Sequence, residues 1–313
     1  MTAQGAGETP GEPARISVCI ATHKRVARLS ALLDDLASQT LPPHEVVVVD
    51  NDADGSALAL LAQPCERPFE LRSELQPVKN ISITRNRSVA LASGDWLAFV
   101  DDDERAPAQW IEQLVDAAQR YEADAVLGPV VPELPDNAPA WIRRGRFYDW
   151  ARMRSGTPVP PNRLRLGNLL IRASLLRALD PPFDPAYGLT GGEDGDLLAR
   201  LSQQGARMVW CDEAVVREPI EASRLSLRWL LRRALRGGQD FARHTIAGRY
   251  GSGGVGQRST LLLRAATQAF AAGALALLSW PLGRHHAAFW LTRLSANLGK
   301  LSVFWGAHYR EYA

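Results

Sequence analysis

The chain contains little cysteine, and its charges of opposite sign nearly balance. Among 313 residues there are three cysteines, Cys19, Cys65 and Cys211, an odd number at scattered positions. This excludes the disulfide framework of a small secreted protein and fits reduced thiols in the cytosol. No cysteine–histidine spacing resembles a zinc site. The formal net charge of +2 gives no sign of a nucleic-acid partner, and we expect none.

Residues 1–13 lack the apolar core of a secretory signal. They are rich in glycine, proline, threonine and glutamate, a composition that cannot bury enough apolar surface to fold. We therefore expect a disordered tail there. The rest of the chain is long enough for one large domain with an appendage.

Apolar runs and amphipathic segments alternate after this tail. Residues 26–39 carry leucines at helical spacing between two apolar runs, residues 15–21 and 45–49. This strand–helix–strand order predicts parallel strands with a right-handed crossover, and thus an α/β sheet. Similar patterns predict further strands at residues 69–73, 96–100, 125–131, 169–172, 207–210 and 214–217. They also predict helices at residues 57–62, 80–93, 107–121, 174–179 and 197–204.

Two of these strands end in carboxylates. The apolar run 96–100 stops at four acidic residues, 101–104, and strand 45–49 stops at Asp50. The carboxyl ends of parallel strands share one edge of the sheet, where ligands of open α/β folds bind. Clustered oxygen ligands favour Mg²⁺ or Mn²⁺ together with the phosphates of a substrate. A solvated acidic turn is the alternative for such a cluster taken alone.

A third acidic group follows a pair of glycines, in the order Gly191, Gly192, Glu193 and Asp194. Carboxylates near the start of a helix are electrostatically favourable in any protein. The two glycines, however, allow the backbone to approach a ligand closely. Both a binding turn and an ordinary helix start therefore remain open.

The later part of the chain carries clustered arginines. Residues 132–165 mix proline, tryptophan and arginine without periodicity, which suits either a lid that stacks on sugars or a solvated loop. Residues 225–235 predict an amphipathic helix, and Arg228, Arg232 and Arg236 share one of its faces. That face suits a diphosphate, an anionic lipid or plain solvent.

The last third is apolar. Residues 261–282 contain one charge, Arg264, and residues 287–305 are interrupted by Arg293 and Lys300. The first stretch reaches the lower length of a membrane span, but alanine and polar residues lower its hydrophobicity. For residues 223–313 we expect helices that pack on the preceding domain or lie on a membrane surface, in preference to a span.

Taken in order, these motifs resemble glycosyltransferase family 2, the inverting nucleotide-sugar transferases with the GT-A fold. The resemblance covers residues 15–217. It implies a Rossmann-like α/β domain over residues 14–222, with a mixed, mainly parallel sheet flanked by helices, and an α-helical extension over residues 223–313. The motifs that carry it are Thr22-His23-Lys24-Arg25, residues 46–50, Arg85-Asn86, residues 99–103, Gly167-Asn168, Phe183-Asp184-Pro185 and Gly191-Gly192-Glu193-Asp194.

The resemblance implies a nucleotide-sugar donor built on UDP, GDP or dTDP, with Mn²⁺ or Mg²⁺ as cofactor. Thr22 and Asp50 match positions that hold the base and the ribose, and Arg85 matches a position beside the base. Asp101 matches a carboxylate between ribose and metal, and Asp103 matches the direct metal ligand. Asp101 and Asp103 should therefore be essential.

The resemblance also implies that Asp194 is the general base for the acceptor hydroxyl, with Glu193 as its substitute, and that Gly191 and Gly192 lie beside the donor. Inversion takes one displacement, so no protein nucleophile is expected. Asp102 should tolerate substitution better than its neighbours, because successive side chains of an extended backbone point to opposite sides.

Two departures from the family pattern qualify this picture. Many relatives place a histidine that can reach the metal after the last core strand, where this chain has Glu218. Glu218 or a water would take that place. Processive synthases carry Gln-x-x-Arg-Trp, whereas here Arg228-Trp229 lacks the glutamine. This predicts transfer of a single sugar.

The implied acceptor is a glycan or a lipid-linked intermediate of a surface polysaccharide. The implied location is cytoplasmic, peripheral at the cytoplasmic face of a bacterial inner membrane. Two other functions remain open. A nucleotidyltransferase shares the acidic strand ends but usually has a glycine-rich loop after its first strand, which residues 22–25 do not form. A non-catalytic, membrane-associated scaffold would not need the acidic positions intact.

Overall fold

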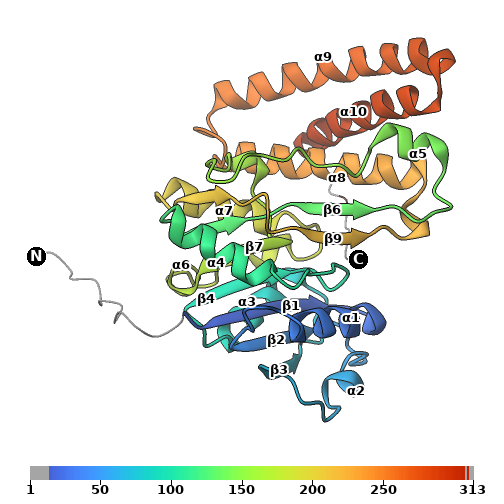
Figure 1. Cartoon of the computed structure of the whole chain (residues 1–313). Coiled ribbons are helices and arrows are strands. Elements are labelled where there is room, and N and C mark those ends of the chain that lie inside the picture. The colour runs from blue at the N-terminus through green and yellow to red at the C-terminus, as the bar shows by residue number, and fades with distance from the viewer. Residues whose placement is uncertain (1–13, 307–308, 310–313) are drawn as a thin grey trace, which may run out of the picture.

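The computed structural model describes residues 14–306 and Tyr309, so the expected disordered tail at residues 1–13 lies outside the described part. A seven-stranded sheet runs through its lower half in the order β3-β2-β1-β4-β7-β5-β8 (Figure 1). Among these strands β7 is antiparallel to both neighbours, and the others are mutually parallel. The prediction of a mixed, mainly parallel sheet is therefore confirmed. The strands are β1 (Ile16–Thr22), β2 (Glu45–Asp50), β3 (Glu70–Leu75), β4 (Trp96–Val100), β5 (Ala125–Leu127), β7 (Asn168–Arg172) and β8 (Met208–Trp210).

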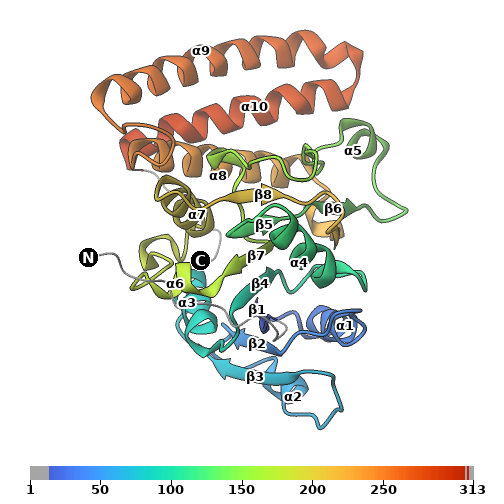
Figure 2. The same cartoon turned by 60° about the vertical axis from the view of Figure 1, so that its left-hand side comes forward.

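Helices cover both faces of this sheet, which is why its central strands are apolar on both sides. Alternate side chains of each strand enter separate cores. Val46 and Val48 of β2 belong to the core that includes residues of α1 and α4, whereas Val47 and Val49 belong to the core that includes residues of α3, α6 and α7. These two sets of helices lie on opposite faces of the sheet (Figure 2). The helices are α1 (Val26–Ala37), α2 (Leu58–Leu61), α3 (Ile81–Leu91), α4 (Trp110–Arg120), α6 (Ala173–Arg177) and α7 (Glu193–Gln203).

The single strand predicted at residues 125–131 is wrong, because the chain bends at Gly128 and forms two strands. β6 (Val130–Glu133) leaves the main sheet and pairs in parallel with β9 (Val216–Pro219). A Cβ atom at Gly128 would lie 2.2 Å from the carbonyl oxygen of Ala214, so only glycine fits this bend. The small second sheet forms one wall beside the carboxyl edge of the main sheet.

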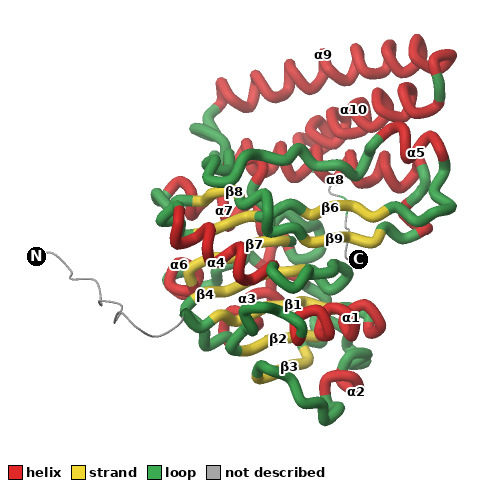
Figure 3. Tube along the Cα trace, in the orientation of Figure 1, coloured by secondary structure: helices red, strands yellow, loops and turns green. Residues whose placement is uncertain are grey.

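Residues 134–166 are mostly irregular and contain α5 (Ala140–Gly145), which contacts the last helix of the chain. Figure 3 shows how the loops cluster between the sheet and the helices at the top of the molecule. Helix α7 begins at Glu193, earlier than the residue 197 predicted, so Glu193 and Asp194 belong to its first turn. Short 3₁₀ turns occur at Pro161–Arg163, Pro185–Tyr187, Ala222–Arg224, Trp280–Leu282 and Val303–Trp305.

The C-terminal extension consists of three long helices, α8 (Leu227–Ile246), α9 (Val255–Ser279) and α10 (Arg284–Ser302). Helix α10 lies between α8 and α9 (Figures 1 and 2). Glycines let α8 and α10 approach closely, since a Cβ atom at Gly238 would lie 1.9 Å from the carbonyl oxygen of Ala296. Helix α8 is much longer than the predicted 225–235, and it packs next to the sheet's functional edge.

Candidate active site

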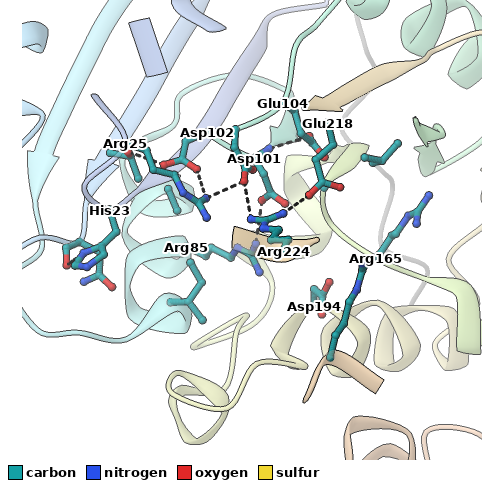
Figure 4. A pocket seen from close by; sticks show the side chains of 18 of the residues that line it. His23, Arg25, Arg85, Asp101, Asp102, Glu104, Arg165, Asp194, Glu218 and Arg224 are labelled. Atoms are coloured by element: carbon teal, nitrogen blue, oxygen red, sulfur yellow. Dashed lines mark hydrogen bonds and ion pairs between the residues drawn. The ribbon is translucent and has the colours of Figure 1, made fainter. Parts of the chain in front are cut away.

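A cavity of about 470 Å³ opens at the carboxyl edge of the main sheet. Its walls come from the end of β1, the acidic turn after β4, the start of α7 and the first half of α8 (Figure 4). Of the residues predicted to form the site, five line this cavity: Thr22, Arg85, Asp101, Asp103 and Asp194. Four others, Asp50, Gly191, Gly192 and Glu193, do not line it.

The acidic residues after β4 form a tight turn rather than an extended strand. The Glu104 amide donates to the Asp101 carbonyl oxygen at 3.1 Å, and the Glu104 carboxylate accepts from the Asp101 amide at 3.0 Å. The alternation argument for Asp102 is therefore wrong. Asp102 is buried and accepts hydrogen bonds from the Thr22 hydroxyl and the Arg25 guanidinium, both at 2.8 Å. It ties the acidic turn to the end of β1.

Asp103, the expected metal ligand, is held by arginines. Its Oδ2 atom lies 3.2 Å from Arg25 and 3.0 Å from Arg224, and its carboxylate is buried. Arg224 also forms an ion pair with Glu218 at 2.5 Å. Arg224 thus bridges the two carboxylates that were expected to meet a metal (Figure 4).

Asp101 lines the cavity, and its side chain is 49% exposed. Desolvation by the surrounding protein atoms raises the pKa of the Asp101 carboxyl group to about 6, and the negative charges of Asp103 and Asp102 raise it further. Arg85, 3.4 Å away, lowers this pKa but does not cancel the other effects. A carboxylate in such surroundings gains from any cation that binds beside it.

Arg85 connects the acidic turn to α7. Besides Asp101, it forms an ion pair with Glu193, whose side chain is only 3% exposed. Burial raises the pKa of the Glu193 carboxyl group to about 7, against the opposing effect of Arg85, and Asp194 raises it further. Since Glu193 points at Arg85 and does not line the cavity, it positions Arg85 rather than facing an acceptor.

Asp194 faces the cavity from the first turn of α7 (Figure 4). Its Oδ1 atom accepts from its neighbour's amide, that of Gly195, at 2.7 Å, and its Oδ2 atom accepts from the Leu166 amide at 3.3 Å. These two backbone donors fix the orientation of the carboxylate. The predicted base therefore lies where an acceptor hydroxyl can reach it.

The glycine pair before Asp194 turns the chain into the helix, with φ angles of 79° at Gly191 and 93° at Gly192. Both lie in the left-handed region, which glycine adopts without strain. The turn packs against α8 and not against the cavity, because His244 is hydrogen-bonded to the Gly192 carbonyl oxygen at 2.8 Å. The two glycines therefore do not line the cavity, and their contact with a donor stays a prediction.

Asp50 is also placed outside the cavity. It is fully buried, and its carboxylate accepts from the amides of Ala57 at 2.8 Å and Asp52 at 3.0 Å, which fixes the loop after β2. The next residue, Asn51, lines the cavity instead, together with His23. The strand-end pattern thus located a loop that borders the cavity, although Asp50 itself does not line it.

The cavity residues that sequence reasoning did not predict include several from the irregular segment and from α8: Trp150, Arg165, Trp229 and Arg233. The mixture of tryptophan and arginine in residues 132–165 was a signal for them, but its lack of periodicity gave no means to place a side chain. Arg224, in the 3₁₀ turn before α8, was not predicted either.

The carboxylates present suit a hard divalent ion by their chemistry, since Asp101, Asp103 and Glu218 bring oxygen donors to one cavity. Burial raises the pKa of Asp101, and the negative charge of Asp103 raises it further, so a cation bound beside them would relieve this repulsion. Within the residues that the structure describes, no three such side chains meet in metal-binding geometry. Arg224 lies between two of them and would have to move.

Comparison with known proteins identifies relatives of this chain. The family model described as "Glycosyl transferase family 2" matches residues 17–175. The succinoglycan biosynthesis protein ExoM of Rhizobium meliloti is 36% identical over 245 residues, which are 75% of this chain and 76% of that protein. Galactofuranosyltransferase GlfT1 of Mycobacterium tuberculosis is 27% identical over 64% of this chain and 68% of its own length.

Solved structures show the same fold. The mannosyltransferase PcManGT from Pyrobaculum calidifontis, in complex with GDP-Man and Mn²⁺, superposes with a TM-score of 0.61 at 19% identity, over 93% of this chain and 88% of that chain. S. aureus TarS 1-349 with UDP-GlcNAc gives a TM-score of 0.52 at 17% identity, over 95% and 93% of the two chains. The match of the family model, the relative at 36% identity and the shared fold agree, and the chain belongs to glycosyl transferase family 2.

Proposed function

We propose that the protein is an inverting, metal-assisted glycosyltransferase that moves one sugar from a nucleotide-sugar to a hydroxyl of a glycan or lipid-linked acceptor in polysaccharide synthesis. One observation carries this proposal: Asp194 faces the same cavity as Asp101, Asp103 and the arginines around them. The name of the relative from Rhizobium meliloti supports a role in polysaccharide synthesis.

The donor's nucleoside would lie on the side of the cavity formed by Thr22, His23, Asn51 and Lys79. The leaving diphosphate would lie toward Arg85 and the acidic turn, where guanidinium groups stabilise the developing negative charge. A divalent ion held by Asp101 and Asp103 would supply further positive charge to that diphosphate. Release of Arg224 from Asp103 would accompany its binding.

The acceptor hydroxyl must lose a proton as its oxygen forms the new bond to the sugar carbon. Asp194 takes this proton, because its carboxylate faces the cavity and accepts from the backbone amides of Gly195 and Leu166, whereas Asp101 and Asp103 are paired with arginines. The bond between sugar and diphosphate breaks in the same displacement, so the sugar's configuration inverts and no covalent protein intermediate forms.

Exchange of Asp194 tests this assignment. Asp194→Asn should lower the turnover number by about 10²–10⁴-fold, while calorimetric binding of a nucleoside diphosphate with Mn²⁺ stays within twofold of wild type. A thermal-shift screen of nucleotide-sugars first identifies the donor, since tight binding raises the melting temperature. Near-normal turnover in the variant would refute the role of Asp194. A chain that binds no nucleotide at all would instead favour a scaffold.

The second part of the proposal concerns the membrane. Helix α9 turns small residues inward, at Ala265, Ala269, Ala272 and Ala276, and leaves large apolar side chains outside. Among the outward residues, Phe270 is 82% exposed and Leu277 is 79% exposed. Val255–Leu282 is also, within the described residues, one helix with the length and hydropathy to cross a membrane. An exposed apolar face of this size marks an interaction surface.

We infer that α9 lies along the cytoplasmic surface of a membrane with this face in the lipid. It packs lengthwise on α10, which packs on α8, so a lying helix keeps the whole bundle intact. Phe270→Ser with Leu277→Ser should release the protein from vesicles of phosphatidylglycerol and phosphatidylcholine in co-sedimentation. Ala274→Ser, which changes a small exposed residue of the same helix, serves as the control. Equal binding of both variants would contradict the proposal.

A further inference from the structure

Two arginines at the far end of the cavity have no acidic partner. Arg165 and Arg233 both line the cavity. In the described part of the chain no carboxylate lies within ion-pair distance of either guanidinium group, whereas Arg25, Arg85 and Arg224 in the same cavity are all paired. Charged side chains that are largely out of water are normally paired. These two therefore lack the negative group that their neighbours have.

Aromatic rings hold both guanidinium groups in place. Arg165 stacks on Trp150 at 4.4 Å from the ring centre, and Arg233 lies 5.2 Å from the ring centre of Trp229 and 5.8 Å from that of Trp150. Burial lowers the pKa of both guanidinium groups. Neighbouring arginines lower it further, Arg233 for Arg165, and Arg236 and Arg224 for Arg233, while the more distant Glu218 opposes the shift at both. Positive charge gathered in this way reduces the stability of the empty cavity, an arrangement expected of a binding site and not of a structural one.

Their position relative to Asp194 separates them from the donor. In Figure 4, His23 and Arg25 lie on one side of the acidic turn, and Arg165 lies beyond Asp194 on the other side. Arg233 comes from α8, on that same wall. A donor that places its nucleoside near His23 and its diphosphate near Arg85 leaves Arg165 and Arg233 to the second substrate.

We propose that Arg165, Arg233 and Trp150 form an acceptor subsite that binds a phosphoryl group of the acceptor, close to the hydroxyl that Asp194 deprotonates. The subsite rests on the proposed transferase function. The acceptor class is then a phosphate-bearing glycan, such as a sugar linked through phosphate or diphosphate to a lipid. Two converging guanidinium groups match the two negative charges and several oxygens of a phosphate monoester better than a single carboxylate.

The test uses full-length protein in neutral detergent, saturated with whichever of UDP, GDP or dTDP binds best. Glucose 1-phosphate is the probe, with glucuronate and glucose as the carboxylate-bearing and neutral comparisons, and dissociation constants come from saturation-transfer NMR titrations. Arg165→Gln and Arg233→Gln should each weaken glucose 1-phosphate binding about tenfold or more, since each removes charged hydrogen bonds. Arg232→Gln, an exposed arginine on α8, is the matched control and should change it less than twofold.

Melting temperatures separate binding from folding. Because Arg165 and Arg233 lack acidic partners, their glutamine variants should melt at or above the wild-type temperature. Arg233→Lys keeps the charge but loses the planar fork, so it should show intermediate binding. Any of three results would overturn the subsite. Arg232→Gln weakens the binding of glucose 1-phosphate as much as the other variants do, the nucleotide displaces this probe, or glucuronate binds as tightly as glucose 1-phosphate. Failure of every nucleoside diphosphate to bind would refute the transferase proposal instead.

Discussion

Acidic side chains are buried at both edges of the main sheet, but their surroundings shift their pKa values in opposite directions. At the amino edge, Glu45 begins β2 and is fully buried. It accepts from the Ser17 hydroxyl at 2.5 Å and from the Ser93 hydroxyl at 2.9 Å, and it pairs with Arg72 at 3.0 Å. Burial would raise the pKa of the Glu45 carboxyl group, but these partners lower it below its ordinary value.

At the carboxyl edge the balance is reversed. The buried Glu104 accepts from one backbone amide, that of Asp101. Burial raises its pKa well above the ordinary value, and the nearby charge of Asp101 raises it further. The pKa values of Asp101 and Glu193 are raised too. The amino edge is thus organised for stability, and the carboxyl edge keeps unfavourable charge that a bound cation or substrate can relieve.

The largest effect is expected at the amino edge. Glu45→Ala removes the carboxylate that Ser17, Ser93 and Arg72 share, and it leaves buried donors without acceptors. Removal of one member of a buried charged group costs about 3–5 kcal/mol. Urea unfolding at pH 7.5 should show this loss as a lower midpoint with an unchanged slope. A loss below about 1 kcal/mol would remove the proposed contrast between the edges.

Much of this contrast follows from the sequence, because it depends on strand ends. Continuous apolar runs located the strands, and the change from apolar to acidic residues after Val100 located the functional edge. The spacing could not reveal the turn at residues 101–104, since the alternation rule holds only for extended backbone. That is why the sequence indicated Asp101 and Asp103 correctly as cavity residues but misjudged Asp102.

The acceptor side of the cavity could not be predicted residue by residue. Arg165 and Arg233 are far apart in the chain, and they meet because α8 folds back over the sheet edge. The Gly237-Gly238 pair also concealed the length of α8, since glycines lower helix propensity. In the structure the helix continues through them, because Gly238 gives α10 room to approach.

The next largest effect is expected at Asp102. Asp102→Asn keeps a polar group near Thr22 but loses the charged hydrogen bond from Arg25, so stability should fall by about 1–3 kcal/mol. Asp101→Asn is the control from the same turn. Because Asp101 is half exposed and its contact with Arg85 is long, at 3.4 Å, this control should lower the unfolding midpoint less. If Asp102→Asn were the milder change, the turn conformation described here would be wrong.

A gain in stability is expected at Glu104. Glu104→Gln keeps an oxygen for the Asp101 amide and removes a buried charge that repels Asp101, so the apo protein should become about 1 kcal/mol more stable at pH 7.5. Glu45→Gln at the other edge should do the opposite. Differential scanning calorimetry of the two variants tests the pair directly. A lower melting temperature for Glu104→Gln would show that the buried charge of Glu104 does not destabilise the carboxyl edge.

The smallest effect is a change in pH dependence at Glu193. The carboxyl group's folded pKa of about 7 lies above its ordinary value of 4.5, so the fold binds this proton more tightly than the unfolded chain does. The resulting stability is fully present below pH 4.5 and is lost as pH rises through about 7. Compared with wild type, Glu193→Gln should therefore lose less stability between pH 5 and pH 8 in urea titrations. The Glu45 carboxyl group has a lowered pKa, so its contribution to stability is lost as pH falls. Glu45→Gln should therefore be less stable than wild type at pH 8, and this difference in stability should shrink as pH falls. Parallel pH profiles for wild type and Glu193→Gln would show that folding does not raise the pKa of Glu193.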